Sequence, residues 1–170
     1  SPPIQQGAQG LQEEVQEVAD FNGDGFIDNA TKDESTNEIK VWLSEGGQFV
    51  SDTVWLSGIT AADKFISGDF DGDGRSDALM FDKPNGTWKV ALSDGNQFGT
   101  LNTWRSGFGA NEDGFAADMN GDGKADIVTF YKEGGSWKTR VAVSDGVGNF
   151  SDTAEYTFVV GTDTHQPLLG

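Results

Sequence analysis

Residues 69–77 read Asp69-Phe70-Asp71-Gly72-Asp73-Gly74-Arg75-Ser76-Asp77, with carboxylates at the first, third, fifth and ninth positions of the stretch. A hard cation such as Ca²⁺ takes roughly six to eight oxygen ligands, which alternate side chains and one backbone carbonyl can supply where the chain turns at a glycine. Gly74 provides the turn, and Arg75 is placed to offer its carbonyl. The stretch therefore predicts a calcium-binding loop.

The same pattern occurs twice more, at residues 20–28 and 118–126, so the three copies are separated by a constant 49 residues. A constant interval indicates that one supersecondary unit is repeated in tandem. We number the positions of each loop 1 to 9 and predict one Ca²⁺ per loop, about three in all. The predicted ligands, at positions 1, 3, 5, 7 and 9, are Asp20, Asn22, Asp24, Phe26 and Asp28; Asp69, Asp71, Asp73, Arg75 and Asp77; and Asp118, Asn120, Asp122, Lys124 and Asp126, with position 7 contributing its backbone carbonyl.

Alternating apolar residues and turn signals follow each loop. In the second repeat, strands are predicted at residues 78–81 and 88–93, and Asn85-Gly86 between them is a strong hairpin signal. A further strand is predicted from Phe98 to Trp104. Each repeat then holds four short antiparallel strands with the acidic loop between the first and the second, which is the form of a propeller blade.

The predicted fold is all-β, with three four-stranded antiparallel blades of a partial β-propeller. The repeats span about residues 15–58, 59–107 and 108–160, with a linker at 1–14 and a tail at 161–170. Closed propellers have about four to eight blades, and three blades leave two sheet faces bare. We therefore expect closure by self-association, a two-fold dimer being the simplest ring, or by further repeats of a longer parent chain.

The repeat resembles the FG-GAP/VCBS family. The resemblance rests on the Asp-x-Asn/Asp-Gly-Asp-Gly-x-x-Asp loop, the Val-Ala-Leu-Ser strand at residues 90–93 and the aromatic-x-Ser-Gly ending at residues 104–107, and it covers roughly residues 15–160. It implies a β-propeller with Ca²⁺ at the rim of each blade. Similar repeats form the head of integrin α subunits and propeller lectins, and they occur as appendages of secreted bacterial enzymes and toxins.

Two other interpretations of the loops were weighed. An EF-hand shares the first nine positions but also needs a bidentate Glu at position 12 and flanking helices, whereas position 12 is Thr31, Met80 or Thr129. A turn capped by Asp and Asn without metal fits one loop well but fits three copies at a constant interval poorly. The first repeat carries Asn22 where the second has Asp71, so its site is expected to be the weakest or to lie in an edge blade.

Composition limits the partners. The 170 residues include 28 acidic and 11 basic side chains, for a formal net charge of −17, which argues against nucleic acid and anionic membranes as partners. No run approaches the length of a membrane span, so membrane insertion is not expected. The chain has no cysteine, and the predicted calcium loops favour a secreted or cell-surface location.

The aromatic residues suggest a ligand surface or a core. Trp55, Trp104 and Tyr156 share one repeat position, where they could stack on sugars or pack between neighbouring blades, and packing is favoured. Trp88 and Trp137 are predicted to share a core position. Trp42, Trp55 and Trp104 are the candidate ligand-binding residues, and for Trp42 packing in an edge blade is the alternative.

No enzyme is predicted. The lone histidine, His165, lies in the polar C-terminal stretch, and Ser44, Ser93 and Ser144 are equivalent strand ends without a partner base. The sequence favours an extracellular calcium-binding module for adhesion to, or recognition of, a protein or glycan. The alternatives are a non-catalytic appendage or fragment of a secreted enzyme or toxin, and a propeller lectin that binds glycans.

Overall fold

The computed structural model describes residues 15–152 and 161–162. The predicted linker at 1–14, Tyr156 and residues 163–170 of the predicted tail lie outside the described residues. The described part is all-β, and it contains no helix that is long and apolar enough to cross a membrane.

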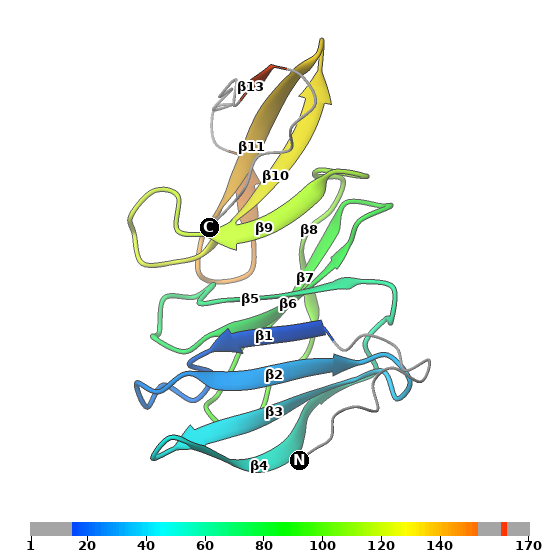
Figure 1. Ribbon diagram of the computed structural model, residues 1–170. Coiled ribbons are helices and arrows are strands. Elements are labelled where there is room, and N and C mark those ends of the chain that lie inside the picture. The colour runs from blue at the N-terminus through cyan, green and yellow to red at the C-terminus, as the bar shows by residue number, and fades with distance from the viewer. Residues whose placement is uncertain (1–14, 153–160, 163–170) are drawn as a thin grey trace.

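Three antiparallel sheets follow one another along the chain (Figure 1), as the spacing of the loops predicted. Blade 1 consists of β1 (Val15–Ala19), β2 (Asp28–Asp33), β3 (Glu38–Glu45) and β4 (Gln48–Ser57). Blade 2 consists of β5 (Lys64–Gly68), β6 (Asp77–Asp82), β7 (Thr87–Ala91) and β8 (Asn102–Arg105). Blade 3 consists of β9 (Asp113–Ala117), β10 (Asp126–Glu133), β11 (Ser136–Ser144) and β12 (Phe150–Asp152). The predicted three four-stranded blades are confirmed.

Blade 3 carries one addition. The short strand β13 (Gly161–Thr162) pairs with β11 at Trp137 and Ser136. The chain therefore rejoins the sheet at residues that the sequence had assigned to a tail.

The blades stack in a row in which β1 lies beside β5 and β5 beside β9 (Figure 1). Two apolar cores fill the spaces between neighbouring blades. The first joins blades 1 and 2 through residues such as Phe21, Val41 and Met80, and the second joins blades 2 and 3 through residues such as Phe70, Trp88 and Ile127. A third cluster, of Val128, Phe130 and Val141, lies within blade 3. Because each of the other two cores is shared by two sheets, neighbouring blades stabilise one another.

The fourth strand of blade 2 is shorter than the sequence predicted. A strand was expected from Phe98 to Trp104, but β8 begins at Asn102, and Phe98 forms an isolated bridge with Ser93. The backbone N–H of Phe98 donates instead to the carbonyl of Trp55 in blade 1 at 3.0 Å. Phe98 therefore bonds to the neighbouring blade in addition to its bridge within its own blade.

The prediction that Trp88 and Trp137 share a core position is wrong. Trp88 pairs across the hairpin with Phe81 and is fully buried, whereas the corresponding pair in blade 3 joins Phe130 to Thr139. The hairpin between β10 and β11 is longer than that between β6 and β7, and the pairing continues outward to Glu133 and Ser136. Trp137 lies in this extension, outside the shared core.

Candidate functional site

The acidic loop at residues 69–77 is wound around its first carboxylate. Asp69 Oδ1 accepts hydrogen bonds from the N–H groups of Gly72 at 2.7 Å and Asp73 at 3.1 Å, and its Oδ2 accepts one from Gly74 at 2.8 Å. Gly74 has a φ of 91°, a left-handed conformation that glycine adopts without strain. The loops at 20–28 and 118–126 repeat these bonds from the same positions.

The carboxylate at position 9 connects the loop to the rest of its blade. Asp77 is completely buried, and its two oxygens accept hydrogen bonds of 2.8 Å from the backbone N–H groups of Phe70 and Ser93. Asp28 and Asp126 make the same two contacts in blades 1 and 3. The carboxylate at position 9 therefore connects the start of the loop to a serine at or just after the end of the third strand of the blade: Ser44, Ser93 or Ser144.

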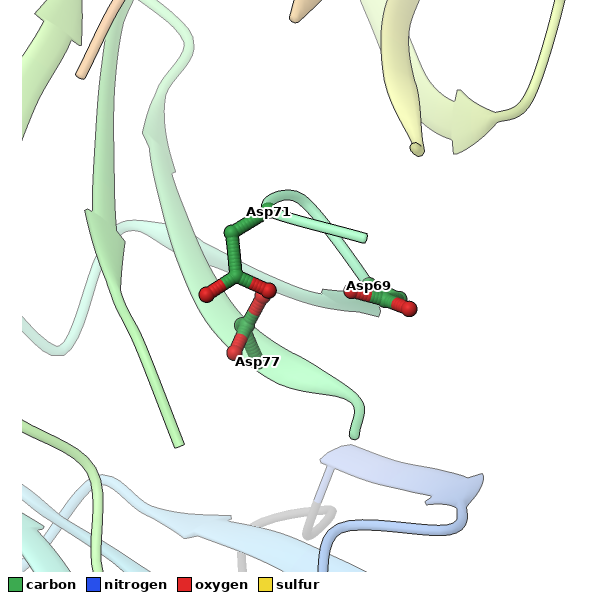
Figure 2. A group of neighbouring side chains, drawn as sticks. All are labelled: Asp69, Asp71 and Asp77. Carbon is green, nitrogen blue, oxygen red and sulfur yellow. The ribbon is translucent and has the colours of Figure 1, made fainter. Parts of the chain in front are cut away.

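Three carboxylates of the second loop converge. Oxygens of Asp69, Asp71 and Asp77 all lie within 4.8 Å of one another, and Figure 2 shows Asp71 and Asp77 next to each other with Asp69 on the opposite arm of the loop. Burial, together with the nearby charges of Asp71 and Asp69, raises the pKa of Asp77 to about 7, although its two backbone hydrogen bonds act in the opposite direction. Burial and the nearby charges of Asp73 and Asp69 also raise the pKa of Asp71. A cation would relieve this repulsion.

The carboxylate at position 5 has a different partner. Asp73 forms an ion pair with Arg75, and Asp122 forms one of 2.9 Å with Lys124. Position 5 was predicted to be a ligand in every loop, and the cations two residues later in the second and third loops are the sequence signal for this pairing. In the first loop, Asp24 accepts a hydrogen bond of 3.0 Å from the Asn22 amide instead.

The donor set of the second loop fits a hard divalent cation. Carboxylate oxygens are the ligands that Ca²⁺ prefers, and three of them converge here within one turn of chain. The first and third loops replace one carboxylate by the amide of Asn22 or Asn120, whose oxygen is also a suitable ligand. The cluster of Asp69, Asp71 and Asp77 could therefore bind a metal ion.

The candidate tryptophans lie in two environments. Trp55 is 4% exposed and its ring contacts Phe98 at 5.2 Å, while Trp104 is 5% exposed and contacts Phe150 at 5.3 Å. These contacts agree with the packing interpretation. Trp42 is half-buried in blade 1, where it pairs with Asn29. A role for the three tryptophans in ligand binding stays a prediction.

Sequence reasoning missed a pocket of about 210 Å³ between blades 2 and 3. Its lining combines charged and apolar residues: Arg105, Gly107, Phe108, Gly109, Arg140, Val141 and Asp152. Arg105 forms an ion pair of 2.7 Å with Asp152, and its Nε is buried with no hydrogen-bond partner among the described residues. Arg140 forms an ion pair of 3.1 Å with Glu112.

The Arg105–Asp152 ion pair is specific to this junction between blades, whereas the positive charge of Arg140 has a counterpart at the other junction. At the equivalent repeat positions between blades 1 and 2, Arg105 is replaced by Leu56, Arg140 by Lys89 and Asp152 by Thr100. Arg105 and Asp152 therefore have no charged counterpart at the first junction. A comparison of the repeats position by position is the signal that could have revealed the pocket.

Comparisons with known proteins agree with the fold. A family model described as an FG-GAP-like repeat matches residues 20–80 and 69–129. Among solved structures, a lectin from Agrocybe aegerita, described by its specific recognition of non-reducing terminal N-acetylglucosamine, is 29% identical and superposes with a TM-score of 0.70. The match covers 85% of this chain and 38% of the lectin chain, so this chain spans well under half the length of that lectin. No curated protein matches the chain.

Proposed function

Because the chain belongs to the FG-GAP-like repeat family, we propose that it is a non-catalytic recognition module and that its ligand is a glycan. The observation that carries the proposal is the likeness, at 29% identity over 85% of this chain, to a lectin that recognises terminal N-acetylglucosamine. That likeness favours a glycan over a protein ligand. We further propose an extracellular location, because calcium is plentiful there.

The pocket between blades 2 and 3 is the proposed sugar site. The guanidinium groups of Arg105 and Arg140 can donate hydrogen bonds to the hydroxyl oxygens of a sugar. The carboxylate of Asp152 can accept hydrogen bonds from the hydroxyl groups of the same sugar. Phe108 supplies an apolar wall. The volume of about 210 Å³ is below the about 300–1,000 Å³ of sites for larger ligands, which favours one terminal monosaccharide over a long oligosaccharide.

Each acidic loop is proposed to hold one Ca²⁺ with a structural role. When bound, the ion supplies positive charge to the carboxylates at positions 1 and 9 of each loop, and in the second loop also to Asp71 at position 3. Asp77 already accepts a hydrogen bond from the N–H of Ser93, so an ion that orders the loop also orders the chain just after β7. The loops would in this way stabilise the blades that form the sugar site, without contact with the sugar.

The test is binding of a glycan array by the whole chain, followed by calorimetry with N-acetylglucosamine. Asp152→Ala should lower the affinity at least tenfold, because it removes the acceptor and the ion-pair partner of Arg105. Thr100→Ala changes the equivalent position at the other junction and should bind as the parent does. If no glycan is bound, the proposed function is wrong. If glycans are bound and Asp152→Ala has no effect, the function stands and the pocket is not the site.

A further inference from the structure

The two junctions between blades use one set of hydrogen bonds. Between blades 1 and 2, the Ser93 hydroxyl donates to the carbonyl of Phe21 at 2.6 Å, and the N–H of Ser76 donates to the carbonyl of Asp20 at 2.8 Å. The later blade supplies both donors, and positions 1 and 2 of the earlier blade's loop supply both acceptors.

Blades 2 and 3 repeat this set. The Ser144 hydroxyl donates to the carbonyl of Phe70 at 2.6 Å, and the N–H of Ala125 donates to the carbonyl of Asp69 at 2.7 Å. The same bonds occur at the same repeat positions, so both junctions join an earlier blade to a later blade in the same way.

An aromatic contact completes each junction. Phe98 of blade 2 meets Phe21 of blade 1 edge to face, with ring centroids 5.7 Å apart. Phe150 of blade 3 meets Phe70 of blade 2 at the same distance of 5.7 Å. Phe98 and Phe150 are 4% and 0% exposed, so each junction buries the phenylalanine that the later blade contributes.

The outer face of blade 1 carries the donor side of a third junction. Ser44 is the equivalent of Ser93 and Ser144, and Ile27 is the equivalent of Ser76 and Ala125. Phe49, the equivalent of Phe98, is 58% exposed, and Ile27 is 59% exposed. Blade 1 lies at one end of the row (Figure 1), so these groups meet no preceding blade in the described part of the chain.

The loop of blade 3, at the other end of the row, carries the acceptor side. Asp118 and Met119 occupy positions 1 and 2, whose carbonyls accept hydrogen bonds at both internal junctions. Met119 is 46% exposed, whereas Phe21 and Phe70 at the equivalent positions are completely buried. The two ends of one chain are thus complementary to each other.

We infer that a second copy of this chain occupies both ends. The Ser44 hydroxyl of one copy donates to the Met119 carbonyl of the other, the Ile27 N–H donates to the Asp118 carbonyl, and Phe49 packs on Met119. A two-fold arrangement forms this junction twice and leaves neither end free, which is the closed symmetry that homo-oligomers favour. The resulting ring of six blades lies within the range of about four to eight found in propellers.

The first test is the mass of the whole chain in solution by light scattering at micromolar concentration. We expect the mass of two chains for the parent and of one chain for Phe49→Asp, with an unchanged circular dichroism spectrum because Phe49 is exposed within one copy. Val147→Asp, at a residue that is 85% exposed and outside both ends, should retain two chains. A single-chain parent, or a Phe49→Asp variant that keeps two chains, would overturn the inference.

A cross-linking test distinguishes this arrangement from other dimers. The chain has no cysteine, so Phe49→Cys and Met119→Cys each introduce a single thiol. A short bis-maleimide should join the two variants when they are mixed and exchanged, and should not join either variant to itself. Self-joined Phe49→Cys, or an unjoined mixture whose mass is that of two chains, would show a different interface and overturn the inference.

Discussion

The Ser93 hydroxyl and the Phe21 carbonyl, 72 residues apart in the sequence, form a hydrogen bond of 2.6 Å that joins blade 2 to blade 1. The backbone N–H of Ser93 also donates to Asp77, so one residue links the acidic loop of its own blade to the loop of the preceding blade. The loops are therefore coupled to each other through the junctions, and a change in one loop is expected to reach its neighbour.

Ser93→Ala tests this link. The substitution leaves the Phe21 carbonyl buried without its partner, which should lower the free energy of unfolding by about 1–3 kcal/mol. Ser106→Ala, at an exposed serine of the same blade, should stay within about 0.5 kcal/mol of the parent. Urea unfolding of both variants measures the difference, and equal midpoints would show that the bond contributes nothing.

Trp104→Ala tests whether the shared aromatic position is core. Trp104 is 5% exposed and packs on Phe150 of the next blade, so truncation should cost about 3–5 kcal/mol of unfolding free energy. Val147→Ala is the exposed control. A Trp104→Ala variant that unfolds with the parent and has lost glycan binding would instead support the sugar-stacking role.

Gly114→Ala tests the close packing of blades 2 and 3. A Cβ at this position would lie 2.5 Å from the Trp88 ring and 2.9 Å from that of Phe81, so overpacking should destabilise the protein by about 1–3 kcal/mol. At Gly99 the nearest atom to an added Cβ is the Leu92 carbonyl oxygen at 3.6 Å, and Gly99→Ala should be tolerated. Thermal melts of the pair should differ by several degrees, and coincident melts would contradict the packing.

Asp71→Asn tests the ligand role of position 3. The substitution gives the second loop the amide that Asn22 and Asn120 provide in the other loops. One of the three expected Ca²⁺ sites should weaken severalfold, because one of the three converging carboxylates loses its charge. Calorimetric titration with Ca²⁺ measures the change, and an unaltered isotherm would show that Asp71 is not a ligand.

The repeat pattern predicted most of the fold, because a loop with alternating carboxylates and with glycines at constant positions can adopt few backbone conformations. Predictions from local sequence patterns were wrong where contacts with another blade determine the structure. Phe98 bonds to Trp55 of blade 1 instead of extending β8, and no feature of its own repeat indicates this. Trp137 was misplaced because an equal interval was assumed through a hairpin of different length. The pocket between blades 2 and 3 was missed because Arg105, Arg140 and Asp152 come from different strands that converge only in space.

We propose that the three acidic loops are cation sites that stabilise the blades. Each independent site should add about 2.7 kcal/mol to the free energy of unfolding when free Ca²⁺ is 100 times its dissociation constant, because the unfolded chain has no preformed cluster. The most direct test is a thermal melt of the whole chain in excess chelator and in millimolar Ca²⁺, with bound Ca²⁺ counted by calorimetry. We predict a much lower melting temperature in chelator and about three Ca²⁺ per chain. Coincident melts with no bound calcium would show that the loops are turns that bind no cation.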